Sequence, residues 1–576
     1  MRLSVVGITR ISLVCLLLEM NHGLKTHAAA SKFPLQADFW TNMNQGSVIN
    51  PHRQQQQALE KILLSPDRGS GLLVPASGWH QLHSPLESPC VDIDQVVLDG
   101  SEKLPRWLSL KRYASQAAGH CLGSRGISML MNDLQNKLIA HGFITTRVVV
   151  APQDLTTGRL TLTIIPGTLR HIHFTPDSDR TIRLSNTLCL NEGQLLSLRD
   201  IEQGLENLQR LPGMAASMEL APGDRLGESD IYLRWKQSRG WRVGAMLNDA
   251  GSQSTGRYQG ALLFSVNNPL RVADSAYMSA SSGLDARSGK ANSGVTAHYS
   301  APFGYWALAI TASQVRYRHR LSAANQLIHY RGKMSNLAFQ VSRVLDRNRD
   351  QKTTLSYAVL AGQSDFFAND QRIDVQRRRV AGWRLTLTRR HYFPRAMIDS
   401  GISYHQGTRW FGALPAAEEA FGQGTAKSRY FDLSLQLDIP FHLLRQGWHY
   451  GFNYRQQFSA APLTPPEKFS IGNRWTVRGF DGEHSLMADS GWYIRNSLTW
   501  RTPFSDQALY VGIDYGEVRG NNVGISPTQA LAGGVVGLKG RWLNTGYDLF
   551  AGVPYVKPDG FKTDDFTSGF SLNWQY

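Results

Sequence analysis

From Trp241 to the end of the chain, apolar and polar residues alternate with a period of two. The segments 431–439, 448–455 and 570–576 show it most clearly, as in Phe431-Asp432-Leu433-Ser434-Leu435. Such a period predicts strands with one apolar and one polar face. Aromatic residues gather near the strand ends, as they do at the two surfaces of a bilayer. About 340 residues, at roughly 20 per strand and loop, predict about 16 antiparallel strands.

A closed membrane β-barrel over residues 238–576 explains this single apolar stripe better than the soluble alternative, a β-sandwich. In a sandwich, that one stripe would have to supply the buried inner faces of both sheets. In lipid, every strand must pair in a closed ring because a free edge leaves backbone groups unsatisfied. No segment after residue 30 has the roughly 18 uncharged apolar residues of a membrane helix, so we expect no transmembrane helix.

Residues 89–237 follow a different pattern that occurs twice. The first occurrence predicts a strand at 91–97, two helices, the clearer at 127–141, and strands at 145–150 and 160–165. The second predicts a strand at 171–174, a helix at 198–211 and strands near 215–220 and 231–235. A repeat of about 75 residues indicates two tandem α+β domains, which we place at 89–167 and 168–237.

The N-terminal residues 1–30 combine a basic start, a short apolar run at 11–18 and the small residues 28–30. This is typical of a secretory signal peptide; the alternative, a membrane anchor, would need about 20 apolar residues. Within residues 31–88, the segment 51–64 has helix-forming residues that are polar around most of the circumference. We expect a helix there, in solvent or in a wet channel, followed by a linker up to residue 88.

Charged residues make up only 18% of the chain and aromatics 10%, which fits a barrel wall and excludes a disordered polymer. Net charge is +16, or +14 once residues 1–30 are removed. The basic clusters at 377–379 and 389–391, with Arg384, could bind nucleic acid or lipopolysaccharide. We favour the simpler interpretation, a basic extracellular loop and arginines that face the lumen, and expect no nucleic-acid partner.

Sequence motifs for catalysis are missing. The chain has neither a Walker A motif nor H-E-x-x-H, and the glycine run 533–537 lies in a strand region rather than at a strand-to-helix turn. We therefore expect no enzyme, no cofactor and no metal site.

Three cysteines remain after residue 30. Cys90 and Cys121 both lie in the first α+β domain, and in an oxidising periplasm we predict a disulfide between them. The alternative is that Cys189 is one of the partners. Otherwise Cys189 is a free thiol that behaves as a small apolar residue.

A segment around Val477-Arg478-Gly479-Phe480 interrupts the strand pattern. Arg478 inside a barrel would need a carboxylate partner, because an unpaired buried charge is costly. In the strand 509–518 the alternation turns Gly512, Asp514 and Gly516 to the lumen, where the two glycines leave room for a packed segment. We predict that Arg478 pairs with Asp514; the alternative is a solvated loop arginine.

With these parts in place, the chain resembles the two-partner-secretion transporters (TpsB proteins) of the Omp85 superfamily, in particular exporters of haemolysins and contact-dependent-inhibition toxins. Val477–Phe480 matches the V-R-G-[FY] motif of the loop that folds back into the lumen, and Gly512–Gly516 matches the barrel-wall motif. Residues 531–540 and 552–558 are similar to further family signatures. One departure is Asn267-Asn268-Pro269-Leu270-Arg271, where the family usually has D-N-P-L-G.

The resemblance implies a fold of about 16 strands preceded by two POTRA-like domains and a plug helix at 51–64. It implies a pore in the outer membrane of a Gram-negative bacterium, with the POTRA-like domains in the periplasm, that translocates one large exoprotein without ATP. These domains would bind the exoprotein by β-augmentation, for which the first offers the helix 127–141 and a strand with Thr145, Arg147, Val148 and Val150.

Outer-membrane lipid and lipopolysaccharide would surround the barrel, and we expect a monomer. The main alternative is an Omp85-type factor that assembles outer-membrane proteins, which usually carries more POTRA domains. A passive porin is disfavoured by the two domains, and a barrel enzyme by the missing catalytic constellation.

Overall fold

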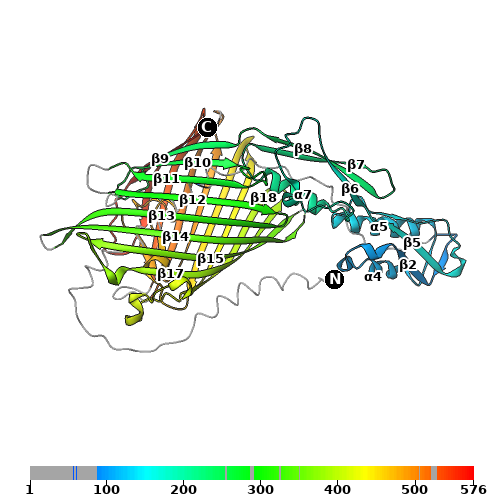
Figure 1. The fold of residues 1–576 in the computed structure, drawn as a ribbon, viewed down its shortest axis with the longest axis horizontal. Helices are drawn as coiled ribbons and strands as arrows, with labels where there is room; N and C mark the ends of the chain where they lie inside the picture. Colours follow the sequence, from blue (N-terminus) through cyan, green and yellow to red (C-terminus); the bar gives the residue numbers. More distant parts are fainter. Residues whose placement is uncertain are drawn as a thin grey trace. The chain divides into compact units, whose positions relative to one another are not determined.

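The computed structural model describes residues 56, 57, 60, 87–252, 256–285, 291–323, 326–348, 350–504, 506–520 and 528–576. The predicted signal peptide, most of the predicted plug helix and the linker up to residue 86 lie outside the described residues. Figure 1 shows the two α+β domains followed by the barrel, as the chain order predicts. No described helix is both long enough and apolar enough to cross a bilayer.

The first α+β domain is a three-stranded sheet, in the order β2-β5-β4, covered by α5, whose Leu130, Leu134 and Leu138 are fully buried. A small second sheet pairs β1 with β3. The elements are β1 (Val91–Ile93), β2 (Gln95–Asp99), α4 (Leu110–Ala114), β3 (His120–Leu122), α5 (Ser124–Ala140), β4 (Arg147–Val149) and β5 (Arg159–Ile165).

Two predicted strands of this domain differ from the structure. The strand expected at 91–97 is broken, because the amides of Asp94 and Gln95 both donate to the carbonyl of Gly158, at 2.7 and 3.1 Å, and bend the chain. The strand expected at 145–150 is only three residues long. Its beginning is lost because the Thr146 hydroxyl turns inward and accepts a hydrogen bond from the Gly167 amide at 3.0 Å.

The second α+β domain repeats this order of elements, and its sheet order β6-β8-β7 matches that of the first. Leu208, Ile231, Leu233 and Trp235 are fully buried in its core. Helix α7 begins after Ser197, whose hydroxyl accepts from the Arg199 amide. The elements are β6 (Thr168–Phe174), α6 (Leu184–Thr187), α7 (Leu198–Gln209), β7 (Met214–Pro222) and β8 (Glu228–Gln237).

The barrel closes where β27 pairs with β9, for example Leu572 with Leu247. In the described part of the chain it has 16 long antiparallel strands and the two-residue β16 (Gln371–Arg372), so the predicted barrel of about 16 strands is confirmed. The long strands are β9 (Trp241–Asn248), β10 (Gln259–Asn267), β11 (Ser275–Gly283), β12 (Ala291–Phe303), β13 (Trp306–Ala323), β14 (Gln326–Arg347), β15 (Gln351–Ala368), β17 (Arg378–Phe393), β18 (Ala396–Thr408), β19 (Arg429–Leu443), β20 (Gln446–Ser459), β23 (Ser490–Arg501), β24 (Gln507–Arg519), β25 (Thr528–Trp542), β26 (Thr545–Val556) and β27 (Thr567–Gln575).

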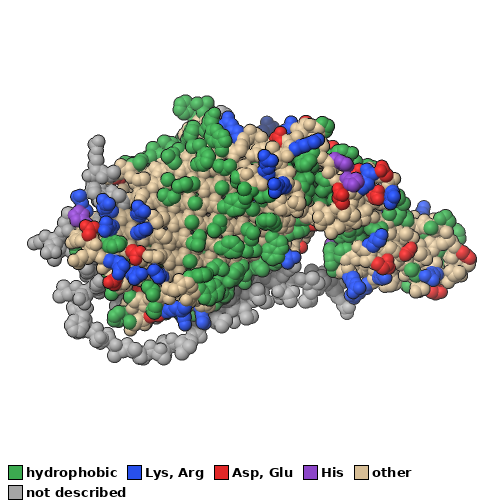
Figure 2. All heavy atoms as spheres, in the orientation of Figure 1, with side chains coloured by type: hydrophobic (Ala, Val, Ile, Leu, Met, Phe, Trp, Pro, Cys, Tyr) green, Lys and Arg blue, Asp and Glu red, His purple; other side chains and the backbone are tan. Residues whose placement is uncertain are grey.

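The apolar stripe of each strand faces outward. On β24, Val511 and Ile513 are more than half exposed, whereas Asp514, the residue after Ile513, is fully buried. Figure 2 shows hydrophobic side chains gathered over the outer surface of the barrel. The alternation therefore separates a lipid-facing surface from a polar interior.

Helix α7 of the second domain contacts the turns between barrel strands on the domain side. The Tyr305 hydroxyl, in the β12–β13 turn, donates to the Asp200 carboxylate at 2.6 Å. The Asn207 side chain donates to the Gly304 carbonyl at 2.8 Å. Glu206 pairs with Arg347 and Lys352 on either side of the β14–β15 turn. These polar contacts hold the second domain against the barrel.

Candidate functional site

The long connection between β20 and β23 folds back into the barrel. It contains a short hairpin of β21 (Phe469–Ile471) and β22 (Leu486–Ala488), and its apolar side chains form one cluster with Leu531 on β25. Val477 is fully buried in this cluster and Phe480 is 5% exposed. The segment 477–480 therefore lies inside the barrel, and we call it seated when it is packed there against β24, β25 and β26.

Arg478 and Asp514 form a bidentate ion pair in this site. The Nε and Nη2 atoms of Arg478 donate to the two carboxylate oxygens of Asp514, at 2.6 and 2.7 Å. The Arg478 backbone amide donates to the same carboxylate at 3.0 Å, and Nη2 also donates to the Asn496 carbonyl at 2.9 Å. Asp514 is 0% exposed and Arg478 is 8% exposed, so the charges compensate each other away from bulk water.

A group of glycines on the barrel wall makes room for the segment 477–480. A Cβ atom on Gly552 would lie 2.9 Å from the Gly479 Cα, and one on Gly516 would lie 3.0 Å from the Val477 side chain. Gly479 itself has φ of 95°, which a residue with a side chain adopts only with strain. A Cβ on Gly512 or on Gly533 would overlap Arg478.

Sequence reasoning identified Gly512 and Gly516 but not the part played by Gly533, which it noted only as a member of the glycine run 533–537 and of the family signature 531–540. A signal was available, since the period of two on β25 turns Gly533 inward. It was missed because only the strand register of the structure aligns Gly533 with Asp514.

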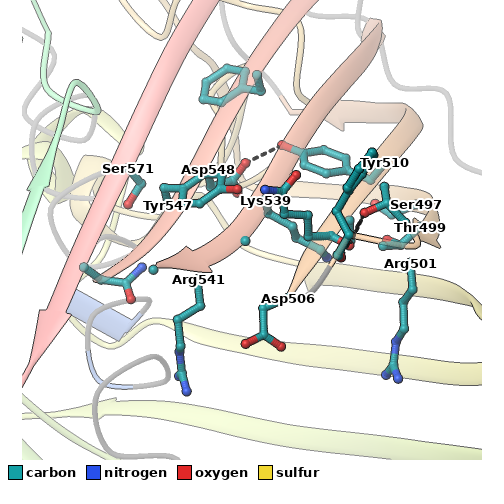
Figure 3. Close-up of a pocket in the computed structure, with 18 of the residues that line it drawn as sticks. Ser497, Thr499, Arg501, Asp506, Tyr510, Lys539, Arg541, Tyr547, Asp548 and Ser571 are labelled. Atoms are coloured by element: carbon teal, nitrogen blue, oxygen red, sulfur yellow. Dashed lines mark hydrogen bonds between the residues drawn. The ribbon is translucent and has the colours of Figure 1, made fainter. Parts of the chain in front are cut away.

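A cavity of about 970 Å³ lies beside the seated segment and is lined by several cations. Figure 3 shows Tyr510 and Asp548 joined by a hydrogen bond of 2.9 Å, with Lys539 next to them. Arg495 is a second cation near Asp514, with its Nε 3.8 Å from the carboxylate, and it also donates to the Trp475 carbonyl at 2.8 Å. Asp514 thus lies between two guanidinium groups, an arrangement that the sequence did not predict.

The three described residues of the 51–64 segment are helical, and two of them contact β11. The Gln56 side-chain amide donates to the Ser279 hydroxyl at 3.0 Å, and the Tyr277 hydroxyl donates to the Glu60 carboxylate at 2.6 Å. Tyr277 and Ser279 belong to the buried stripe of β11, which faces the interior of the barrel. Gln57 is exposed.

Cys90 and Cys121 form the disulfide, which links the residue before β1 to β3. Cys189 is free. Burial raises the pKa of its thiol to about 12, with the Asp200 carboxylate acting in the same direction, so the thiol is protonated and unreactive.

The four residues proposed to bind the exoprotein do not form one surface. Arg147 is exposed on β4 and Val150, just after it, is 38% exposed, whereas Val148 is buried. Thr145 lies before the strand, and its hydroxyl is close to the position that a Cβ of Gly167 would occupy. Of these four residues, only Arg147 and Val150 have exposed side chains at the edge of the sheet.

Each basic cluster includes an arginine that pairs with an acid. Arg378 is 8% exposed on its side chain and pairs with Glu418, and Arg390 pairs with Asp399 at 2.6 Å. Within the described ranges, no group of three His, Cys, Asp or Glu side chains is arranged to hold a metal ion.

Asn267–Arg271, the segment that departs from the family pattern, forms the β10–β11 turn. Arg271 stands where the family usually has glycine and has φ of 64°, a left-handed conformation that glycine adopts more readily. The turn is held by the buried carboxylate of Asp274, which accepts from the Leu270 amide, and by the Asn268 side chain, which accepts from the Ala273 amide.

Comparison with known protein families agrees with this architecture. The family described as haemolysin secretion/activation protein ShlB/FhaC/HecB matches residues 227–540. The chain belongs to this family. A ShlB-type POTRA domain matches residues 91–167 of the transporter, and a second POTRA domain matches residues 168–222.

Individual relatives are similar along most of the transporter. The outer membrane transporter CdiB-2 of Burkholderia pseudomallei (strain 1026b) is 34% identical over 512 residues, 85% of this chain and 87% of the relative. The outer membrane transporter CdiB of Dickeya dadantii (strain 3937) is 26% identical, over 93% of this chain and 94% of the relative. The solved structure of CdiB from Acinetobacter baumannii superposes with a TM-score of 0.81 at 27% identity, covering 95% of this chain and all of that one.

This chain is therefore an outer-membrane transporter of two-partner secretion, with its POTRA domains in the periplasm, and it translocates a partner exoprotein. The family match decides for the exporter over the assembly factor that the sequence left open as the alternative.

Proposed function

We propose that the transporter is a pore with two closing elements, the 51–64 helix and the seated segment 477–480, and a periplasmic receptor for one large exoprotein. The exoprotein is of the haemolysin, adhesin or contact-dependent-inhibition type. The observation that carries the proposal is the buried Arg478–Asp514 ion pair, which ties a long loop to the inner wall of the barrel.

The hydrogen bonds from Gln56 and to Glu60 support the role of the 51–64 helix as a plug, because both join it to lumen-facing residues of β11. A helix that is polar around most of its circumference suits a wet lumen, because most of its surface needs no apolar cover. The contacts of its described residues with β11 are hydrogen bonds between polar side chains, which water can replace when the helix leaves and the exoprotein enters.

The transporter has no catalytic role in this proposal, and folding of the exoprotein outside the cell, rather than ATP, draws the chain through the pore. Closure of the barrel by β27 and β9 within one chain supports a monomer. Its exposed apolar stripes would contact outer-membrane lipid and lipopolysaccharide.

The plug is tested by conductance in planar bilayers. Replacing both contact residues, Gln56→Ala with Glu60→Ala, should raise the open probability of single channels because the helix loses its hydrogen bonds to β11. Gln57→Ala is the matched control, since Gln57 is exposed on the same helix. An unchanged open probability in the double variant would contradict the plug.

A further inference from the structure

Strand β4 lies at the edge of the first POTRA sheet. In the described part of the chain it pairs only with β5, and successive residues of a strand turn their backbone groups to opposite sides. The Thr146 carbonyl and the Val148 amide are not bonded to β5. They point away from it, to the side where a further strand would add.

These two outward groups are already bonded, by a side chain of α5. The Gln135 side-chain nitrogen donates to the Thr146 carbonyl at 2.8 Å, and the Gln135 side-chain oxygen accepts from the Val148 amide at 3.1 Å. One carboxamide thus bonds the carbonyl and the amide that flank Arg147. A single residue of a parallel neighbouring strand would bond the same two groups.

The position of Gln135 on its helix explains why its side chain reaches the edge. Its neighbours Leu134 and Leu138 are fully buried against the sheet, which fixes the rotation of α5. Gln135 follows directly on this buried stripe and lies over β4. The edge stays open only beyond it, towards Val150, which is 38% exposed.

We propose that the Gln135 carboxamide is a displaceable cap on β4, which an extended segment of the exoprotein replaces when it adds to the sheet as a strand. This proposal rests on the proposed receptor role of the POTRA domains and adds how the exoprotein would bind there. Without a bound segment the cap satisfies two backbone groups and blocks pairing with unrelated strands, the usual hazard of an open edge. A segment binds only if its own contacts outweigh those it displaces.

The cap makes an unusual prediction, because removing a side chain from the receptor surface should strengthen binding. The exoprotein segment no longer displaces two hydrogen bonds, so we expect Gln135→Ala to bind it roughly 3- to 10-fold more tightly. Gln135→Met, which keeps the length of the side chain but not its amide, should act in the same direction. In both variants the Val148 amide should exchange with deuterium faster than in the wild type.

The experiment uses the full-length transporter in lipid nanodiscs and, as probe, an unfolded segment of the exoprotein that it secretes. Asn132→Ala is the matched control on an exposed position of the same helix. Val150→Pro tests the receptor role itself, since proline removes an outward amide and blocks strand addition. We expect this variant to bind the segment at least 10-fold more weakly.

The outcomes separate the cap from the receptor. Tighter binding by both Gln135 variants, with the control unchanged, supports the cap. Unchanged or weaker binding in either Gln135 variant, while Val150→Pro weakens binding, overturns the cap and leaves the receptor role standing. Unchanged binding in Val150→Pro overturns both, because the exoprotein then does not use this edge.

Discussion

The two members of the Arg478–Asp514 pair should not be equivalent when they are replaced. Asp514 is fully buried and faces a second guanidinium, since the Nε of Arg495 lies 3.8 Å from its carboxylate. In Arg478→Ala, Asp514 keeps Arg495 and the amide of Asn496, which donates to it at 3.3 Å. In Asp514→Asn, the buried Arg478 and the partly buried Arg495 lose the carboxylate that lies between them.

The size of the effect follows from the burial. Removing one member of a buried ion pair costs about 3–5 kcal/mol, which shifts an equilibrium roughly a hundred- to several-thousand-fold. We expect Asp514→Asn to reach the upper end of this range, because repulsion between Arg478 and Arg495 adds to the lost pair. Arg478→Ala should lie at the lower end, because the remaining carboxylate is still partly compensated.

Val477 offers an assay, because it is fully buried only while the segment is seated. A Val477→Cys reporter in a Cys189→Ala background should resist a membrane-impermeant maleimide in whole cells. Labelling should rise with Arg478→Ala and rise further with Asp514→Asn, and secretion of the exoprotein should fall in the same order. Asp548→Asn is the control, since this lumenal acid bonds Tyr510 instead of the seated segment.

Two results would refute this reasoning. Equal labelling of Arg478→Ala and Asp514→Asn would mean that Arg495 does not compensate Asp514. Normal secretion by a stably assembled Asp514→Asn would mean that the ion pair is not needed for transport.

Three further predictions concern single features. Gly552→Ala should unseat the segment and reduce secretion, because its Cβ would lie 2.9 Å from the Gly479 Cα; Gly451→Ala, whose nearest contact is 3.4 Å, should secrete normally. Replacing both disulfide cysteines by Ser should destabilise the first POTRA domain by about 3–4 kcal/mol, given a sequence separation of 31, as measured by hydrogen exchange of β5 in urea. Burial alone would raise the pKa of Glu87. Hydrogen bonds from three backbone amides at the start of α5 have the larger effect and hold the pKa below its usual 4.5; the amides are those of Gly126, Gly123 and Arg125. The stabilisation that Glu87 provides is therefore complete above pH 4.5 and is lost as the pH falls through the lower pKa of the folded state. The Gly126 amide should then lose its protection from hydrogen exchange in acid. Glu87→Gln should not show this acid dependence.

Much of the fold could be predicted because its signals are local. The alternation of Val511 and Ile513 with Gly512 and Asp514 follows from the strand pleat, and the structure places these side chains on the expected faces. The break between β1 and β2 could not be predicted, because the cause is the Gly158 carbonyl, more than 60 residues away in the chain.

The candidate site, too, could be predicted only in part. A buried arginine requires an acid, and the alternation along the strand 509–518 turns Asp514 to the lumen, so the partners Arg478 and Asp514 could be named from the sequence. Arg495 and Gly533 could not be assigned, because their positions near Asp514 depend on the register of β23 and β25 against β24. Register is a property of the paired sheet and not of either strand.

The sequence by itself determined the class of the protein: two repeated α+β domains, a barrel with an apolar outer face, and a charged segment that needs a partner inside it. These features follow from the period of the apolar residues, the cost of burying a charge and the order of elements along the chain, all of which can be read from short stretches of sequence. Only the tertiary structure decided which groups meet, as with Asp514 between two guanidiniums or the Gln135 amide on the edge of β4. Such contacts join residues through folded backbones, and a difference of one residue in register would separate them.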